Sequence, residues 1–558
     1  MDGAAFARAE HSPSSPGSDR VSAVISGSGA RPIGLVTDIS GADSGVTFDR
    51  AAVEALAEES DPTLASAARV GSLVKIRSGA HWLIASVRNL KLTADGHADI
   101  AARIDFLGEG EEERLTGKLY RFRRGVTNYP TPGAPVYPVA TGDLHQIYAT
   151  DDRANVRIGT VYPTRDIPAS LYIDALLGKH FALLGSTGTG KSTAAALILH
   201  RICQSAPHGH IVMIDPHGEY AAAFATTGAI YDVGNLSMPY WLMNFDEHCE
   251  VFVTSTGSQR QVDADILAKC LLAARAKNRL ATDVKLTVDS PIPYLLSDLT
   301  ALVQAEMGKM DRAGDTAPYL RLKTKIEEIR NDPRYAFMFS GMLVADTMAT
   351  FIQRIFRMPA DGRPISVIDV SGVPSEITTV VVAVLSRMVF DFAIWSRGEA
   401  LRPILLVCEE AHRYVPNDKQ ADASSVGRIL SRIAKEGRKY GVSLGLITQR
   451  PSDLAEGVLS QCGTIISMRL NNDRDQAFVR AAMPEGARGF LDAIPALRNR
   501  ECIICGEGVA TPIRLVFDDL EESRRPASAD PSFSSLWKQG GNEAALARTI
   551  RRWRSQRH

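Results

Sequence analysis

The most informative stretch of this chain is a glycine-rich segment between an apolar run and an amphipathic one. Residues 185–192 read Gly-Ser-Thr-Gly-Thr-Gly-Lys-Ser, directly after Phe181–Leu184 and directly before the helix-like stretch from Ser192 to Ile202. A strand that turns sharply into a helix is the context in which such a segment binds phosphate. The glycines let backbone N–H groups crowd around a β-phosphate, and the helix dipole adds a favourable field. The sequence therefore predicts a nucleoside triphosphate site rather than a turn that binds nothing.

The side chains of this loop have separate expected roles. Lys191 is expected to reach the β- and γ-phosphates, and Ser192, backed by Thr193, is expected to ligate Mg²⁺. The other predicted members of the nucleotide-binding loop are Gly185, Ser186, Thr187, Gly188, Thr189 and Gly190.

The composition limits what else the chain can be. At 558 residues it is too long for one core, and its net charge of −1 means that any surface for nucleic acid must be local. Seven cysteines without framework spacing suit a reducing, cytoplasmic compartment. Cys502-Ile-Ile-Cys505 has no second pair, so a buried strand is favoured over zinc or redox chemistry.

No segment is expected to span a membrane. The longest apolar stretch, Ile377 to Trp395, contains Arg387 and Asp391, which predicts a core helix. Residues 1–30 are rich in Ala, Ser, Gly and Pro and contain no apolar core of a signal peptide. We expect them to form a disordered leader.

The pattern of apolar residues divides the rest of the chain. Residues 31–138 show short alternating runs punctuated by Gly, Pro and Asp, which predict a small antiparallel β-barrel or sandwich. Four runs carry this pattern: 33–36, 72–77, 82–87 and 98–104.

From His180 onward, strand-like and helix-like stretches alternate, which predicts a mainly parallel α/β sheet covered on both faces. The core is expected in two parts, 139–244 (including a connector from Pro138 to Lys179) and 359–520. The candidate strands are Phe181–Leu184, Ile211–Asp215, Ile365–Val370, Ile404–Cys408, Ser443–Thr448, Thr464–Met468 and Glu501–Cys505.

Residues 245–358 interrupt the alternation and are expected to form an all-helical insertion. Their helix-like stretches are Asp263–Lys277, Tyr294–Met307, Tyr319–Arg330 and Thr347–Arg357. Residues 521–558 form a polar tail with a basic end, which is either solvated or a strap onto a neighbouring subunit or DNA. The basic end contains Arg548, Arg551, Arg552, Arg554 and Arg557.

A second acidic motif follows the apolar run that ends at Cys408. In hydrolytic phosphate-loop proteins, the first acid at such a strand end holds Mg²⁺ through water and the second polarises the attacking water. Glu409 and Glu410 occupy these two positions, and neighbouring residues on a strand point to opposite sides. The pair favours hydrolysis over phosphate transfer to another substrate, with an ordinary acidic loop as the alternative.

Other polar residues follow strands at the same sheet edge. Asp215 or Glu219 supports the metal or the water, or simply forms a turn. Gln449 senses the γ-phosphate and orients water, or only caps the strand end. The cations from Arg428 to Lys439 either complement a helix dipole or supply an arginine finger to a neighbour's nucleotide, which is worth roughly 10³–10⁵ in rate.

Taken together, the motifs resemble those of the HerA family of the HerA/FtsK ATPases. The matching segments are the loop at 185–192, Asp-Pro-His-Gly-Glu-Tyr at 215–220, Glu-Glu-Ala-His-Arg-Tyr-Val-Pro at 409–416, Ile-Ala-Lys-Glu-Gly-Arg-Lys-Tyr-Gly-Val at 433–442, Thr-Gln-Arg-Pro-Ser-Asp-Leu at 448–454 and Arg-Leu-Asn-Asn-Asp-Arg-Asp at 469–475. The β-rich region is similar to the family's HAS-barrel, so the resemblance covers roughly residues 30 to 525.

The resemblance implies a RecA-like fold and a homohexameric ring that hydrolyses ATP with Mg²⁺ at subunit boundaries and moves double-stranded DNA through a pore. It also implies an effector partner: a NurA-type nuclease, or in bacterial anti-phage defence a sirtuin-like or other enzyme. Motif matching makes Gln449 the sensor and Arg438 the arginine that acts on the neighbouring subunit. Glu409 and Glu410 match the acidic pair, with Glu409 standing where many relatives have Asp.

Two other functions are compatible with these motifs. One is an ATP-gated scaffold that assembles an effector enzyme and hardly moves DNA. The other is a pumping ATPase of conjugation, which would normally have a membrane segment or a membrane-docking domain.

Overall fold

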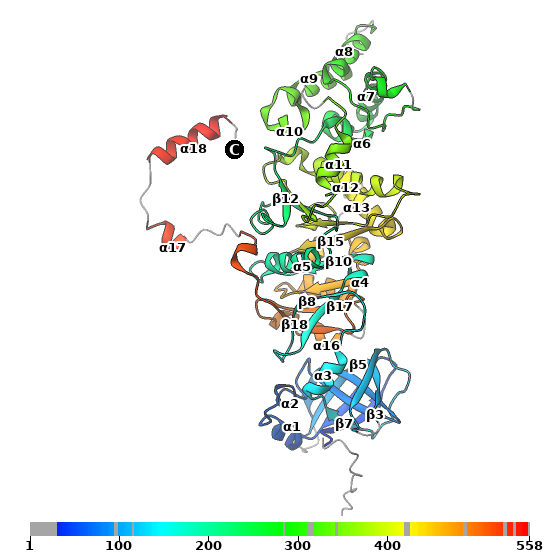
Figure 1. Cartoon of the computed structure of the whole chain (residues 1–558), viewed down its shortest axis with the longest axis vertical. Coiled ribbons are helices and arrows are strands. Elements are labelled where there is room, and N and C mark those ends of the chain that lie inside the picture. The colour runs from blue at the N-terminus through cyan, green and yellow to red at the C-terminus, as the bar shows by residue number, and fades with distance from the viewer. Residues whose placement is uncertain are drawn as a thin grey trace, which may run out of the picture.

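The computed structural model has the shape of a column with three parts (Figure 1). A β-barrel lies at one end, a large sheet with its helices in the middle, and a group of helices at the other end. The structure describes residues 31–555 except 94–98, 114–115, 283–284, 311–315, 341–343, 418–423, 484–487, 528–532 and 539–542. The predicted fold class, a RecA-like core with an N-terminal barrel and a helical insertion, is confirmed. The predicted leader 1–30 and Arg557 lie outside the described residues.

The barrel closes because its first hairpin pairs with a long later strand. Its order is β2-β1-β7-β3-β4-β5, with β2 also pairing with β5, and β6 adds to β5 outside the closed ring. Alternating residues such as Val46, Val74 and Ile104 fill the interior, as the period of two requires. The strands are β1 (Gly34–Ile39), β2 (Asp43–Phe48), β3 (Leu73–Ser78), β4 (His81–Leu92), β5 (Ile100–Glu112), β6 (Leu119–Arg124) and β7 (Pro135–Pro138), with helices α1 (Arg50–Leu56), α2 (Pro62–Ala65) and α3 (Thr141–Ile147) beside them.

The large sheet has the order β12-β13-β11-β14-β15-β10-β16-β17-β18-β8-β9, in which the strands from β12 to β16 are parallel and the rest antiparallel. All seven candidate strands are present within a residue or two. Its strands are β8 (Asn155–Val161), β9 (Pro168–Tyr172), β10 (Phe181–Leu184), β11 (Ile211–Asp215), β12 (Gly228–Tyr231), β13 (Ile365–Asp369), β14 (Ile404–Cys408), β15 (Val442–Thr448), β16 (Thr464–Ser467), β17 (Glu501–Gly506) and β18 (Ile513–Phe517).

The sequence expectation for residues 138–179 was incomplete. We expected a connector, but β8 and β9 form the antiparallel end of the large sheet, and β8 pairs with β18. The helices of the core are α4 (Ile173–Gly178), α5 (Lys191–Ser205), α12 (Ser375–Trp395), α13 (Ser425–Glu436), α14 (Glu456–Leu459), α15 (Asp473–Ala482) and α16 (Arg488–Leu491).

Between residues 245 and 358 the described residues contain helices and no strand. These helices form the end of the column opposite the barrel (Figure 1). They are α6 (Phe245–Phe252), α7 (Ser258–Ala276), α8 (Leu296–Met307), α9 (Ala317–Asn331), α10 (Ala336–Phe339) and α11 (Met348–Ile355).

Two segments singled out in the sequence, the apolar helix α12 and the Cys502–Cys505 segment, are buried in the core. By length and composition α12 is the one described helix that could cross a membrane, but 67% of its most apolar window is buried inside the protein. Cys502 and Cys505 are buried in β17 and unbonded, and no described group of His, Cys, Asp and Glu could hold a metal ion as a cluster of three. The tail contains α17 (Phe533–Leu536) and α18 (Glu543–Ser555), which stand apart from the column in Figure 1.

Candidate nucleotide site

The glycine-rich loop connects β10 to α5 and turns through two left-handed residues. Gly188 has φ +77° and Gly190 has φ +94°, a region that side chains other than glycine rarely adopt. Gly185 packs so closely on Met468 that a Cβ would approach its side chain to 2.9 Å. The sequence therefore forms this loop because glycine stands where the backbone reverses and where it meets the next strand.

Neighbouring strand ends hold the loop in place. The N–H of Gly185 donates to the Thr448 carbonyl at 3.3 Å, and that of Ser186 donates to the Arg469 carbonyl at 2.9 Å. The Thr187 hydroxyl donates to Gln449 Oε1 at 2.5 Å. Because β15 lies between β10 and β14, Gln449 comes between the loop and the acidic pair.

Lys191 and Glu409 form a buried ion pair at the floor of this site. Lys191 Nζ lies 2.7 Å from Glu409 Oε1, and the side chains are 8% and 4% exposed. The Tyr220 hydroxyl donates to Glu409 Oε2 at 3.0 Å. Burial raises the pKa of Glu409, and the Lys191 ammonium opposes that rise. Each charge therefore has a partner that the bound nucleotide could replace. A phosphate would take the place of Glu409 beside Lys191, and a metal ion would take the place of Lys191 beside Glu409.

Glu410 points elsewhere because its backbone leaves the strand geometry. β14 ends at Cys408, and Glu410 has φ +51°, so the two acids diverge through a left-handed turn and not through strand alternation as expected. Glu410 is 4% exposed, yet its Oε2 accepts no hydrogen bond from the residues that the structure describes. Buried polar atoms normally have partners, so this oxygen is available to an incoming group such as water.

His412 lies beside that oxygen without neutralising it. Its Nδ1 is 3.2 Å from Glu410 Oε2 but hydrogen-bonds to the Thr448 hydroxyl at 2.9 Å. Burial, followed by the Arg413 and Arg450 charges, lowers the pKa of His412 to about 4. The imidazole is therefore neutral at physiological pH and forms no ion pair with Glu410.

The turn after β11 begins at Asp215, for which the sequence left two roles open: supporting the metal or the water, or only forming the turn. The Asp215 carboxylate accepts the N–H groups of His217, Gly218 and Tyr220 at 3.1, 2.9 and 2.9 Å, and burial raises its pKa. These bonds favour the turn-forming role for Asp215. The same turn places the Tyr220 hydroxyl against Glu409. No pattern in the sequence indicated this contact.

The donor set fits Mg²⁺. Ser192 lies close enough to the Tyr220 hydroxyl to influence its pKa, and that hydroxyl donates to Glu409, so the two residues predicted to hold the metal lie near one another. Hydroxyl and carboxylate oxygens are the ligands that Mg²⁺ accepts, with water filling the remaining positions.

A cavity of about 240 Å³ continues from the loop toward the end of β18. It is lined by Gly190 and Thr193 at the start of α5 and by Phe517, Leu520 and Arg525 on the other side. No local pattern predicted this wall, because residues after β18 reach the loop only through the antiparallel end of the sheet.

Arg438 is the predicted site residue that the fold does not bring to this edge. It lies in a short 3-10 helix, Gly437–Tyr440, directly before β15 begins, whereas the glycine-rich loop follows the end of the parallel strand β10. Arg438 is exposed and makes no side-chain hydrogen bond or ion pair with the described residues. It lines a pocket of about 570 Å³ at the amino edge of the sheet.

A glycine-rich phosphate loop and a paired acid at the carboxyl edge of a mainly parallel sheet define a class, the RecA-like P-loop ATPases. The fold is shared by VirB4 of Thermoanaerobacter pseudethanolicus, with a TM-score of 0.50 and 14% identity over 67% of this chain and 99% of that one.

Sequence relatives narrow the class further. The family model for the central domain of helicase HerA matches residues 156–389. The DNA double-strand break repair helicase HerA of Pyrococcus furiosus is 28% identical over 488 residues, 80% of this chain and 84% of that protein. The protein of the same name from Saccharolobus solfataricus is 25% identical over 75% of this chain and 79% of that one. The central part of this chain therefore matches the HerA family model, and most of the chain is similar to HerA helicases.

Proposed function

We propose that this chain is an ATP-hydrolysing DNA translocase or helicase that works as a hexameric ring with ATP at the subunit boundaries. Lys191 and residues 185–193 bind the nucleotide, Ser192 and Glu409 hold Mg²⁺, Glu410 positions the attacking water and Gln449 relays the state of the γ-phosphate. The bound Mg²⁺ would draw charge from the phosphates. The relatives named as repair helicases support DNA as the substrate.

The observation that carries the ring is the position of Arg438. Within one subunit it stands at the amino edge of the sheet and the phosphate loop at the carboxyl edge. An arginine that acts on a transferring phosphate must contact it, so Arg438 serves a nucleotide held by another subunit. Head-to-tail contacts of this kind close into rings.

Mixed rings test this arrangement directly. An Arg438→Ala subunit keeps its own Glu410, and a Glu410→Gln subunit keeps its own Arg438. When two inactive variants share a ring, an intact Arg438 then meets an intact Glu410 at some boundaries, and ATP hydrolysis returns. If co-expressed mixed rings, verified by mass, show no activity, Arg438 acts within its own subunit or only complements the helix dipole.

The DNA contacts are proposed to come from a local ring of Lys and Arg, since the net charge is −1. Binding to duplex DNA should not depend on sequence, and its affinity should fall steeply between low and moderate salt. A strong preference for one sequence, or indifference to salt, would contradict a translocase pore.

We further propose a cytoplasmic location and an effector partner, a nuclease or a sirtuin-like enzyme, in anti-phage defence or DNA end processing. The scaffold alternative predicts ATP binding and assembly with a turnover that duplex DNA does not change. The unpartnered Glu410 Oε2 favours turnover. Measuring ATP hydrolysis with and without duplex DNA, together with the mass in solution, separates the two functions.

A further inference from the structure

The helix that leads to Arg438 begins against the helical region. Ser425 is the first residue of α13, and its N–H donates to Glu250 Oε1 of α6 at 2.7 Å. The Ser425 hydroxyl donates to Glu250 Oε2 at 2.8 Å. The first N–H groups of a helix have no partner inside it, and a negative charge there is favoured by the dipole. The Ser424 side chain accepts the Gly427 N–H at 3.1 Å, so α13 is capped both by its own N-cap residue and by a carboxylate from a separate helix.

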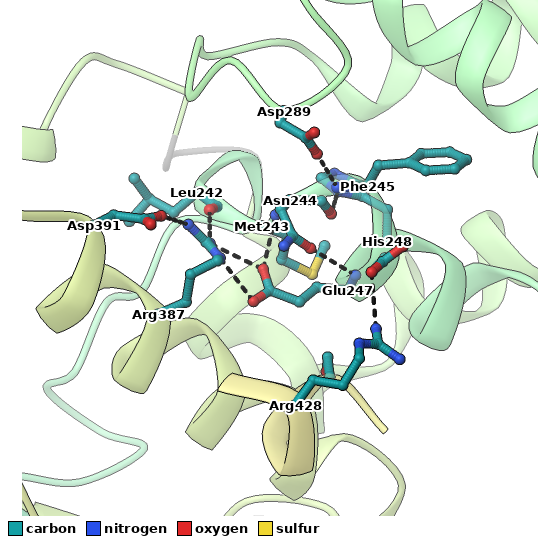
Figure 2. Close-up of polar contacts among 12 residues, drawn as sticks. Leu242, Met243, Asn244, Phe245, Glu247, His248, Asp289, Arg387, Asp391 and Arg428 are labelled. Carbon is teal, nitrogen blue, oxygen red and sulfur yellow. Dashed lines mark hydrogen bonds and ion pairs between the residues drawn. The ribbon is translucent and has the colours of Figure 1, made fainter. Parts of the chain in front are cut away.

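α6 is itself firmly held by the core. Asn244 and Glu247 form a reciprocal cap at its start, with bonds of 2.7 and 2.9 Å. Arg387 of α12 binds both carboxylate oxygens of Glu247 at 2.9 Å and also donates to the Leu242 carbonyl and to Asp391 (Figure 2). Glu247 is 1% exposed. A buried bidentate pair of this kind fixes direction as well as distance.

The far end of α13 is fixed as well. His180 Nδ1 accepts the Leu444 N–H at 2.9 Å, so its Nε2 carries the proton and donates to the Ala434 carbonyl at 3.1 Å. Tyr440 packs edge-on against Phe390 of α12, with ring centroids 5.5 Å apart. Between these anchors, the 12 residues of α13 form a rod about 18 Å long.

We propose that Glu250 is a positioning residue for Arg438 and so controls hydrolysis in the neighbouring subunit's site. This inference rests on the proposed function, in which Arg438 acts between subunits. Glu250 sets the start of α13, and Arg438 lies two residues beyond the end of that helix. In this proposal the helical region acts, through α13, on the next nucleotide in the ring.

The first test compares single variants. Glu250→Ala should reduce ATP turnover about tenfold, because a small displacement of a catalytic group is enough for such a loss. Its affinity for ATP should stay unchanged, since Glu250 bonds to Ser425 of α13 and not to the described residues of the phosphate loop. Glu250→Gln keeps one carbonyl acceptor and should lie between Glu250→Ala and the unchanged protein.

Asp246→Ala is the matched control on the same helix. Asp246 pairs with Arg428 of α13 at 2.8 Å, but both side chains are exposed, 60% and 44% (Figure 2 shows Arg428). Exposed pairs contribute little, so turnover should stay within about twofold. An equal loss in Asp246→Ala would assign the effect to general loosening of α6 and overturn a specific role for Glu250.

Mixed rings decide in which subunit Glu250 acts. Glu250→Ala mixed with Glu410→Gln should regain activity, because the second subunit supplies a well-placed Arg438 to the intact Glu410 of the first. Glu250→Ala mixed with Arg438→Ala should be no faster than Glu250→Ala alone, because one subunit supplies a displaced Arg438 and the other supplies none. This pattern is not expected of a residue that only stabilises its own subunit.

The opposite pattern would overturn the inference. If Glu250 serves its own site, the mixture with Arg438→Ala recovers and the mixture with Glu410→Gln does not. If Arg438→Ala and Glu410→Gln themselves fail to complement each other, the ring mechanism fails, and that result is distinct from a failure of Glu250 alone. Glu250→Gln provides the same comparison if Glu250→Ala does not assemble.

Discussion

The two edges of the large sheet differ in how completely their charged groups are satisfied. At the carboxyl edge, Lys191, Glu409 and Tyr220 are buried and bonded to one another. At the amino edge, Arg438 is exposed and has no polar partner among the described residues. Charges are costly to bury without partners, but the exposed Arg438 is solvated by water and is therefore free to contact another molecule.

In the proposed ring, the chemistry is divided between subunits. The carboxyl edge contains the groups proposed to bind and activate, and the buried Glu410 Oε2 has no hydrogen-bond partner among the described residues. The amino edge contains Arg438, which is proposed to act on the nucleotide of the neighbouring subunit in the transition state. A single subunit should bind nucleotide but hydrolyse it poorly, and each prediction below acts on one side of this division.

The largest effect is expected at the amino edge. Arg438→Ala should lower ATP turnover by about 10³-fold, the lower end of what a transition-state arginine supplies, while ring mass and ATP affinity stay unchanged. Turnover is measured by phosphate release at saturating ATP. Lys439→Ala is the matched control, because Lys439 is an exposed neighbour in the same 3-10 helix. Full activity in Arg438→Ala would leave dipole complementation as its role.

The next effect is expected at the carboxyl edge. Glu410→Gln should still bind ATP but turn it over about 10²-fold more slowly, because an amide cannot polarise the attacking water. Lys191→Ala should lose binding as well, since it removes the charge that faces the phosphates. Fluorescent nucleotide binding and phosphate release separate these cases. Near-normal turnover in Glu410→Gln would transfer the role to Glu219, whose own Gln variant is the control.

Local patterns predicted the groups that lie on consecutive residues. The loop at 185–192 and Glu409–Glu410 are strand-end motifs, and the parallel strands are short buried runs bounded by polar turns. These features need no tertiary information, so the core and its nucleotide loop could be placed from the sequence. The direction of Glu410 could not, because its left-handed backbone is imposed by the turn that follows.

Features made by distant partners were not predictable. β8 is a short strand that pairs with β18, more than 300 residues later, and β9 joins the sheet only by pairing with β8. Tyr220 and Glu250 have unremarkable neighbours in the sequence, and each acquires its role from a partner more than 170 residues away. One sequence cannot reveal such pairs, since neither period nor spacing records them.

A smaller effect on turnover is expected when the Tyr220 hydroxyl is removed. Tyr220→Phe removes the hydroxyl that donates to Glu409 Oε2 and contacts Ser192. We expect turnover at limiting Mg²⁺ to fall roughly three- to tenfold, because losing one hydrogen bond to a charged group costs about 1.5–3 kcal/mol, which water partly restores. Saturating Mg²⁺ should recover most of the loss.

Tyr231→Phe is the matched control for this measurement. Tyr231 is also buried and donates its hydroxyl to the Arg354 carbonyl at 3.2 Å, on the β12 side of the sheet. Its variant should leave the Mg²⁺ dependence unchanged. A similar shift in both variants would mean that the metal site responds to the packing of the sheet and not to Tyr220.

The last prediction concerns stability at acidic pH, away from the working range of the site. His412 has a pKa of about 4 in the folded protein, against about 6.5 for an unperturbed histidine, so the unfolded chain binds the additional proton between these values. The stability contributed by neutral His412 is therefore complete above pH 6.5 and is lost as the pH falls toward 4, by at most about 3 kcal/mol. His412→Asn stays neutral and should flatten this part of the curve of unfolding free energy against pH. His145→Asn, on an exposed residue of α3, should not change it. Equal slopes for His412→Asn and the unchanged protein would show that His412 becomes charged while folded, and its imidazolium would then neutralise Glu410 at acidic pH.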